Sequence, residues 1–477
     1  MATSYSPSRR TALVLSGTGA HGAYHAGVLR ALDEGGVKID VVAGHGIGSA
    51  TAALAAIGGS AKLWEKSGVW SSSNTRSFYG LIRSFSLTRL LGLLLCGFLI
   101  APLALIVIAI FVYAAGFLVE ISGVTTGRDL LVDFSWWLQV FLNEYYLSPV
   151  LPRIVTGIVF AMVLLVLVDK LGEKFRLKKS RRKGSSGRWP FIRAPFDAKS
   201  IRTAFRETIW KLVRGSSPLS CPNDGALGKR YIEVLLESLG QPGFCELLVV
   251  TTDIDARRDL VAALLKEPFR HNFLASQIGI ERAAEAIDLS SEGRDHAIEV
   301  ILGGLTPSQG VDPYHVTFAA DSYWRGETHR LCDRAGSIVR LFAELQLAGV
   351  EQVVVVTAIP SPLPPHHLTS PEGSLQKRLS DFLMAAEAAS LRDALVEASG
   401  SFEAVFLVAP DHNPISSFDF DGSYDDASDR HQTLAELMEC GYEDARHQFI
   451  ESIVGASGEH LNVGDPYGQM VFDETDK

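Results

Sequence analysis

The chain has 477 residues, of which 47% are hydrophobic and 21% are charged, and its formal net charge at pH 7 is −10. These values are typical of a globular protein that can bury at least one full core. The acidic balance argues against a nucleic-acid partner, because such binders need a basic surface. The five cysteines are scattered without zinc-site spacing, so we expect neither a metal nor another cofactor.

The chain begins with a polar tail, residues 1–10, that passes directly into a predicted strand. No cleavable apolar stretch precedes this strand, so we expect the start of the chain to stay in the cytosol. Residues 11–75 are predicted to alternate between strand and helix. The predicted elements are strand Thr11–Ser16, helix Gly22–Asp33, strand Ile39–Ala43 and a helix from Gly48 onward.

A glycine-rich turn joins the first strand to the first helix, with glycines at Gly17, Gly19 and Gly22. Backbone N–H groups at such a helix start form an anion site. A dinucleotide site would also need an acidic residue at the end of the next strand. Asp40 is the only candidate and lies at the start of that strand, so a nucleotide-binding enzyme is the less favoured alternative. The other use of this turn is an oxyanion hole for acyl transfer.

The second predicted strand ends in Gly44-His45-Gly46-Ile47-Gly48. This pattern is typical of a nucleophile elbow, Gly-x-Ser-x-Gly, in which a strained turn exposes the serine. Here Gly46 occupies the place of the serine, and glycine has no atom that can attack an ester. For the nearby Ser16 and Ser49 we favour turn, capping or packing roles over replacement of the missing nucleophile, and for His45 a role in specificity or packing.

Residues 76–173 are predicted to form a membrane hairpin. The 30 residues Leu90–Val119 are uncharged, which corresponds to about 45 Å of helix against about 30 Å of hydrocarbon. The predicted spans cover about residues 90–119 and 147–170. The uncharged part of the second, Ile154–Val168, is short and needs Arg153 to reach the interface.

Basic residues set the predicted orientation of this hairpin. Arg83 and Arg89 precede the first span, a basic linker (residues 174–200) follows the second, and Arg128 is the only basic residue between Glu120 and Leu151. By the positive-inside rule both ends should be cytoplasmic. The aromatic residues near the tip suit either an interfacial helix or packing against the spans. They are Trp136, Trp137, Tyr145 and Tyr146.

Residues 201–477 resume the alternation of apolar strands and amphipathic helices, which predicts an α/β fold with a mainly parallel sheet covered on both faces. The predicted strands are Glu246–Thr252, Gln352–Ala358 and Glu403–Val408. The predicted helices are Ile201–Val213, Ala335–Leu347, Gly373–Ala398 and Asp429–Ile453.

Three motifs together resemble the patatin-like phospholipases. They are the glycine-rich turn, the elbow, and Asp333-Arg334-Ala335-Gly336 ahead of a helix. The stretch Leu15–Leu32 is similar to bacterial members, and Thr251–Asp255 resembles an internal strand end of the family. The resemblance covers residues 11–70 and, more loosely, 200–450. It implies a three-layer α/β/α sandwich, here interrupted by the transmembrane hairpin, and a Ser–Asp dyad.

The resemblance assigns a role to each motif residue. Asp333 takes the place of the dyad base, Gly46 that of the nucleophile, and Thr18, Gly19 and Ala20 would donate backbone N–H groups to the oxyanion. Gly17, Gly22 and His45 belong to the same substrate-binding region, and Gly44 and Gly48 flank the elbow. The chain departs from the family at Thr18, His21, Arg334 and, most severely, Gly46. Asp421-Gly422 imitates the base motif but lacks the following helix and strand, so Asp333 is preferred.

The sequence therefore predicts a membrane-anchored lipid acyl hydrolase-type protein that acts on or binds phospholipids or other acyl esters. Its expected place is the inner membrane of a bacterium, with both termini and the patatin-like domain cytoplasmic and membrane lipids as partners. Gly46 puts its catalytic competence in question. The main alternative is a non-catalytic lipid-binding scaffold or sensor.

Overall fold

The computed structural model describes residues 5–122, 126–142, 152–165, 167–168, 194–215, 219–275, 282–319, 326–360 and 375–454. The chain divides into two compact units. One combines Met1–Gly80 with Phe196–Lys477, and the other is Leu81–Pro195. The chain leaves the first unit through the short strand β3 (Gly80–Leu81) and returns through β4 (Phe196–Asp197).

The first unit is built on a nine-stranded sheet in the order β11-β10-β1-β2-β5-β6-β7, with β9 paired to β5 and β8 to β9. The five strands from β11 to β5 are parallel to one another, β6 and β9 are antiparallel to β5, and β7 is parallel to β6. The predicted mainly parallel sheet is confirmed. The strands are β1 (Thr11–Ser16), β2 (Val41–Gly44), β5 (Glu246–Asp253), β6 (Arg258–Leu264), β7 (Ala284–Asp288), β8 (Tyr314–Thr317), β9 (Thr328–Cys332), β10 (Gln352–Thr357) and β11 (Ala404–Val408).

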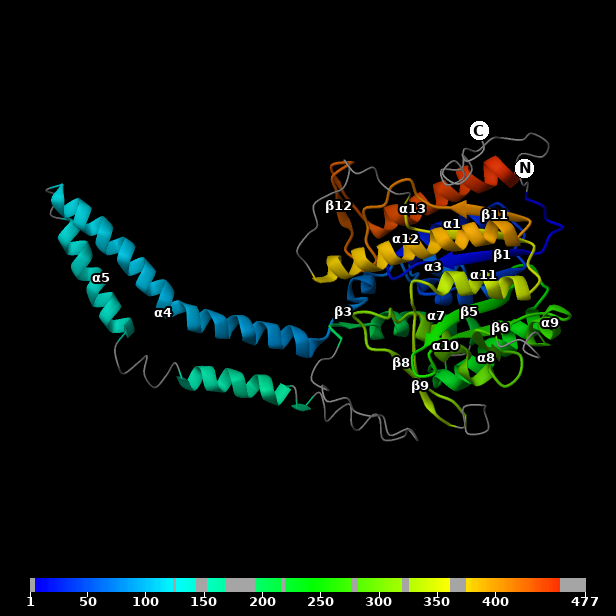
Figure 1. Cartoon of the computed structure of the whole chain (residues 1–477), viewed down its shortest axis with the longest axis horizontal. Coiled ribbons are helices and arrows are strands. Elements are labelled where there is room, and N and C mark those ends of the chain that lie inside the picture. Colours follow the sequence, from blue (N-terminus) through cyan, green and yellow to red (C-terminus); the bar gives the residue numbers. More distant parts are fainter. Residues whose placement is uncertain are drawn as a thin grey trace, which may run out of the picture. The chain divides into compact units, whose positions relative to one another are not determined.

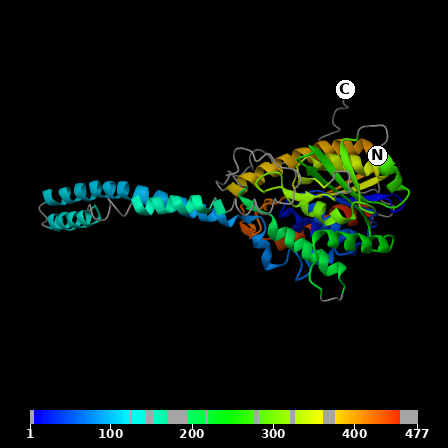
Figure 2. The same ribbon diagram turned by 90° about the horizontal axis from the view of Figure 1, so that it is seen from below.

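Helices cover both faces of this sheet (Figures 1 and 2). Side chains alternate along β1, so that Leu13 and Leu15 join one buried core while Ala12 and Val14 join the other. The helices of the first core are α1 (His21–Glu34), α2 (Ile47–Ala56), α7 (Lys199–Val213), α8 (Asp224–Ser238), α10 (Ala297–Gly304) and α13 (Leu434–Asp444). Those of the second core are α9 (Phe269–Ala275), α11 (Ser337–Leu347) and α12 (Leu375–Ser401).

The helix predicted for Asp429–Ile453 is wrong at its start. A small antiparallel hairpin of β12 (Ser423–Asp425) and β13 (Arg430–Gln432) occupies that stretch. Helix α13 begins only at Leu434, where Thr433 and Glu436 form a capping box. A π-helical segment, η5 (Ala445–Val454), continues α13. The remaining short elements are α3 (Ala61–Trp64), η1 (Ser73–Ser77) and η3 (Arg294–His296).

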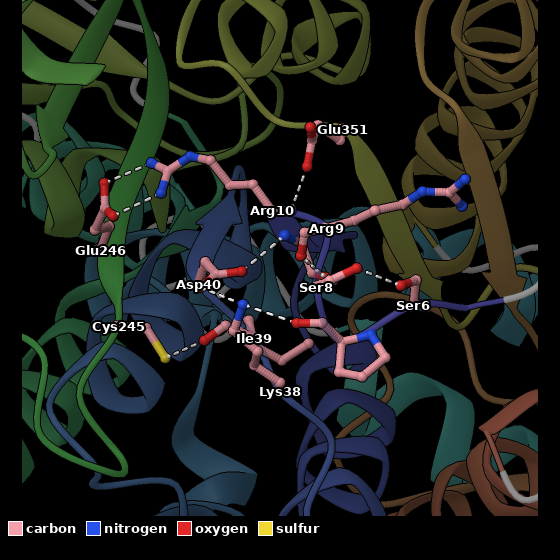
Figure 3. Close-up of polar contacts among 12 residues, drawn as sticks. Ser6, Ser8, Arg9, Arg10, Lys38, Ile39, Asp40, Cys245, Glu246 and Glu351 are labelled. Atoms are coloured by element: carbon pink, nitrogen blue, oxygen red, sulfur yellow. Dashed lines mark hydrogen bonds and ion pairs between the residues drawn. The ribbon is translucent and has the colours of Figure 1, made fainter. Parts of the chain in front are cut away.

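A partly buried polar clasp joins the amino ends of β1, β2 and β5 (Figure 3). Both terminal nitrogens of Arg10 bind the Glu246 carboxylate, at 2.8 and 2.7 Å. The Asp40 carboxylate accepts the backbone N–H of Thr11 at 2.9 Å. Asp40 therefore lies at the amino edge of the sheet, away from the glycine-rich turn at the end of β1, and the geometry removes the acidic partner that a dinucleotide site would need.

The second unit contains the 39-residue helix α4 (Arg83–Ile121) and the 17-residue helix α5 (Thr126–Leu142). Helix α5 packs back along the end of α4, where the rings of Tyr113 and Phe134 lie 6.2 Å apart. Among the described residues one helix, Leu103–Ile121, is long and apolar enough to cross a membrane.

The predicted second span is covered only in part. A helix occupies residues 152–165, whereas residues 147–151 and the basic run from Lys174 to Lys183 lie outside the described residues. Between the two predicted spans the chain forms the amphipathic α5, with Trp136 and Trp137 exposed. The membrane hairpin therefore stays a prediction.

Candidate active site

The turn from β2 to α2 has the geometry of a nucleophile elbow. Gly46 caps the helix with φ +60° and ψ −133°, a conformation that side chains rarely adopt. A Cβ at Gly44 would lie 2.3 Å from the Gly48 carbonyl oxygen, and one at Gly48 would lie 1.9 Å from the Leu15 carbonyl oxygen. These close approaches explain why the turn needs glycine at both flanking positions.

The space that a side chain at position 46 would use is partly filled. A Cβ built there lies 2.3 Å from the Gly17 carbonyl oxygen and 2.9 Å from Oδ2 of Asp333. The Gly17 carbonyl accepts the backbone N–H of Ile47 at 2.9 Å. The structure thus brings the elbow and Asp333 together, as the motifs suggest. The Gly17 carbonyl of the glycine-rich turn, however, occupies the space that a serine side chain at position 46 would need.

The glycine-rich turn between β1 and α1 is itself covered. The Ser417 carbonyl accepts the N–H of Ala20 at 2.8 Å, and a Cβ at Gly19 would lie 2.0 Å from the same oxygen. Within the described part of the chain, the N–H groups of Thr18 and Gly19 make no hydrogen bond. Two of the three expected oxyanion donors are therefore unengaged, and the segment that contains Ser417 occupies the third.

A buried row of three side chains lies beside the elbow. Ser16 Oγ is 2.9 Å from His45 Nε2, and His45 Nδ1 is 3.1 Å from Asp333 Oδ1. All three residues are at most 3% exposed. Ser16 comes from the end of β1, His45 from the turn after β2, and Asp333 from the turn before α11. The sequence predicts a turn or capping role for Ser16 and a specificity or packing role for His45, and it does not connect the two residues.

The charges in this row are coupled. Burial alone would lower the pKa of His45, but the Asp333 carboxylate, with a further contribution from Glu387, raises it, and the net result is a raised pKa. A carboxylate can only accept hydrogen bonds, so in the neutral ring Nδ1 carries the proton. His45 Nε2 is then free to accept the hydroxyl proton of Ser16.

Glu387 of α12 is a site residue that sequence reasoning misses. Its carboxyl group accepts the Thr18 hydroxyl and lies 3.9 Å from His21 Nδ1. Burial raises the pKa of Glu387 to about 7 and lowers that of His21 to about 4. A signal is present in the sequence, because Glu387 lies one helical turn from both Leu383 and Leu391, within the buried stripe of the helix.

Arg334 and Asp421, two further charged residues of the sequence motifs, form ion pairs outside the buried row. Arg334 binds Asp259 of β6 at 3.0 Å, which accommodates the departure from the family at this position. Asp421 pairs with Arg76, and its side chain is 73% exposed, so it lies outside the buried row. No group of three or more metal-ligating side chains occurs within the described ranges. The catalytic roles inferred from the motifs stay predictions.

Residues 13–217 match the family model of the patatin-like phospholipases. The chain carries a patatin-like phospholipase domain. The matched range includes the Leu81–Pro195 unit and ends before Asp333, so the place of Asp333 in the patatin-like site rests on the geometry above.

A search of curated proteins gives no match. Among solved structures, the crystal structure of VipD from Legionella pneumophila is 14% identical, with 93% of this chain and 67% of that chain covered. Its TM-score of 0.30 is too low to support a structural argument.

Restoring the elbow serine is expected to harm the domain rather than activate it. Gly46→Ser and Gly46→Ala should each lower the free energy of unfolding by about 1–3 kcal/mol, because the new Cβ meets the Gly17 carbonyl. Ester hydrolysis by Gly46→Ser should not exceed that of the unchanged chain. Chemical denaturation and an ester assay on all three proteins provide the measurement. A large gain in activity for Gly46→Ser alone would contradict this prediction. It would show that the Gly17 carbonyl moves aside at little cost in free energy.

Proposed function

We propose that this protein is a membrane-anchored lipid acyl hydrolase-type protein that acts on phospholipids or other acyl esters. The observation that carries the proposal is the meeting of three separate motifs. The glycine-rich turn, the elbow and Asp333 converge at position 46, where a Cβ would touch both Gly17 and Asp333. Backbone donors beside a buried carboxylate are the arrangement that acyl transfer requires.

Membrane anchoring is supported by the surface of α4. Its large apolar side chains, such as Leu103 and Ile110, are each 63% exposed, which is unusual for a soluble helix. Arg89 and Tyr113 are separated by about 36 Å along the helix, close to the thickness of a bilayer with part of its headgroup region. Tyr113 contacts Phe134 of α5, and the exposed Trp136 and Trp137 follow on that helix. Aromatic residues at this level suit the membrane interface.

The expected location is the inner membrane of a bacterium, with the patatin-like domain on the cytoplasmic side. The basic residues Arg83 and Arg89 at the start of α4, ahead of its apolar stretch, and those in the linker after the insert support this orientation. Phospholipids of the same leaflet would then be the accessible substrate class.

A non-catalytic lipid-binding protein is the second candidate. It is favoured by Gly46 and by the Gly17 carbonyl, which fills the place of the serine. The two functions are separated by assaying the detergent-solubilised full chain for phospholipid and soluble-ester hydrolysis while measuring its binding to phospholipid vesicles. Hydrolysis supports the enzyme, binding without hydrolysis supports the scaffold, and absence of both contradicts the lipid function.

Introducing charge on α4 is expected to release the protein from membranes. An arginine costs about 2.5–3.5 kcal/mol at the centre of a bilayer, so in the double variant Leu103→Arg/Ile110→Arg the change at Leu103 should cost about this much and the change at Ile110, closer to the interface, less. We expect the unchanged chain to resist carbonate extraction and the double variant to appear in the soluble fraction. Leu375→Arg on α12, where the leucine is also exposed (56%), is the matched control and should stay with the membrane. Equal extraction of all three proteins would contradict the anchor.

A further inference from the structure

We propose that Ser16, His45 and Asp333 form a Ser–His–Asp catalytic triad, in which Ser16 replaces the nucleophile absent from the elbow. This inference rests on the proposed acyl hydrolase function and names the nucleophile of that same site. It assigns the attacking atom to Ser16 Oγ, the general base to His45 Nε2, and the orientation of the imidazole to Asp333.

The hydrogen-bond directions suit these roles. Asp333 Oδ1 lies 3.1 Å from His45 Nδ1 and fixes the ring with its proton on that nitrogen. The opposite nitrogen, Nε2, lies 2.9 Å from Ser16 Oγ, within reach of the proton it would remove. The roles of a triad are recognised by such geometry rather than by the order of residues in the chain.

Ser16 is also placed next to the oxyanion donors. It is the last residue of β1 and directly precedes the glycine-rich turn, where the N–H groups of Thr18 and Gly19 are unengaged within the part of the chain that the structure describes. In other hydrolases, a donor of the oxyanion hole is the backbone N–H that follows the nucleophile. Here the unengaged N–H groups lie two and three residues after Ser16, on the turn that follows it.

The missing side chain at Gly46 leaves Asp333 available to His45. A serine at position 46 would place its Cβ 2.9 Å from Asp333 Oδ2, and its hydroxyl would compete for the carboxylate. With glycine there, the charge of Asp333 acts on the imidazole. The absence of a serine at position 46 and the activation of Ser16 through His45 are therefore linked through the Asp333 carboxylate.

The reaction balances as hydrolysis of an ester by water. Ser16 Oγ bonds to the carbonyl carbon while His45 Nε2 takes the hydroxyl proton. The tetrahedral intermediate then collapses, the bond to the alcohol oxygen breaks, and His45 returns the proton to that oxygen. Water attacks the resulting acyl-Ser16 ester with His45 as base. Ser16 is released with its proton restored, and the carboxylic acid leaves.

The segment that contains Ser417 covers the glycine-rich turn directly after Ser16, so we expect a substrate to displace it. The Ser417 carbonyl holds the N–H of Ala20 at 2.8 Å, and Ser417 itself is fully buried. Displacing this carbonyl would free a third donor on the turn. Because an apolar acyl chain would replace the covering segment, phospholipid vesicles are expected to accelerate reaction at Ser16.

The test is covalent labelling of the full-length chain with a fluorophosphonate, in detergent and in phospholipid vesicles, followed by peptide mapping of the adduct. We expect the adduct on Ser16. Ser16→Ala and His45→Gln should each abolish labelling and lower kcat/KM for a soluble ester by about 10³-fold or more. Ser49→Ala is the matched control, since Ser49 is equally buried but bonds the carbonyls of Gly46 and Ile301. It should keep labelling and rate within about twofold.

Mapping on the unchanged chain tests the proposal even where a variant fails to fold. An adduct on another residue, no adduct, or an unchanged rate in folded Ser16→Ala would overturn the triad. Vesicle binding in the same samples separates this outcome from the proposed function. Vesicle binding without an adduct overturns the triad and leaves lipid recognition standing. An adduct on Ser16 without vesicle binding or phospholipid cleavage supports the triad and contradicts the lipid substrate.

Discussion

Replacing Arg10 with methionine is expected to lower the free energy of unfolding of the domain by about 3–5 kcal/mol. Arg10 binds Glu246 through two hydrogen bonds, and the Glu246 side chain is only 1% exposed (Figure 3). Its guanidinium also lies 3.7 Å from the centre of the Phe269 ring. Without Arg10 the Glu246 carboxylate stays buried with its charge unpaired, which is the costly outcome. Denaturant unfolding of the full chain in detergent measures the change.

The neighbouring residue supplies the matched control for this prediction. Arg9 pairs with Glu403, whose side chain is 56% exposed, so Arg9→Met should cost no more than about 1 kcal/mol. The double variant Arg10→Met/Glu246→Leu removes both charges and should recover part of the loss. A similar small effect for Arg9→Met and Arg10→Met would show that the clasp is solvated and weak.

The first part of the fold could be predicted because short local stretches of sequence determine its strands and turns. The apolar run Thr11–Ser16, the glycine-rich turn and the elbow each determine their own conformation, and the structure places β1 and β2 accordingly. In the second part, the sequence does not predict β6 to β9. They are held by pairing with β5 and with one another, and pairing partners are set by tertiary contacts rather than by periodicity.

The same distinction between local sequence and tertiary contacts explains which site residues the sequence predicts. Asp333 was found because a motif marks it, and the structure places it against Gly46. The contact between Ser16 and His45 depends on strand order and register. β1 and β2 are adjacent, with Leu15 opposite Gly44, so Ser16, the last residue of β1, and His45, the first residue after β2, can meet at the carboxyl edge of the sheet. No spacing within the sequence reveals this neighbour relation, so the sequence predicts a turn or capping role for Ser16 and a specificity or packing role for His45.

Glu387 makes the stability of the domain depend on pH near neutrality. Burial raises its pKa in the folded protein from 4.5 to about 7, so the folded state binds this proton more tightly than the unfolded state. The corresponding stabilisation is fully present below pH 4.5 and is lost as pH rises through 7. At roughly 1.4 kcal/mol for each pKa unit, the loss is about 3 kcal/mol.

The variant Glu387→Gln removes this titration and keeps a group that can accept the Thr18 hydroxyl. Between pH 4.5 and 8, the unchanged chain should therefore lose about 3 kcal/mol of stability relative to Glu387→Gln. Unfolding midpoints measured across this range provide the comparison. Other titrating groups that face Glu387, including His21, His45 and Asp333, are present in both proteins.

Glu397→Gln, at an exposed position of the same helix, is the matched control and should follow the pH dependence of the unchanged chain. Parallel curves for Glu387→Gln and the unchanged chain would mean that the folded protein tolerates an ionised carboxylate beside Thr18. That result would contradict a neutral Glu387 at the glycine-rich turn. Below pH 7 the neutral carboxyl group matters for the chemistry, because it adds no negative charge near the N–H groups that would stabilise an oxyanion.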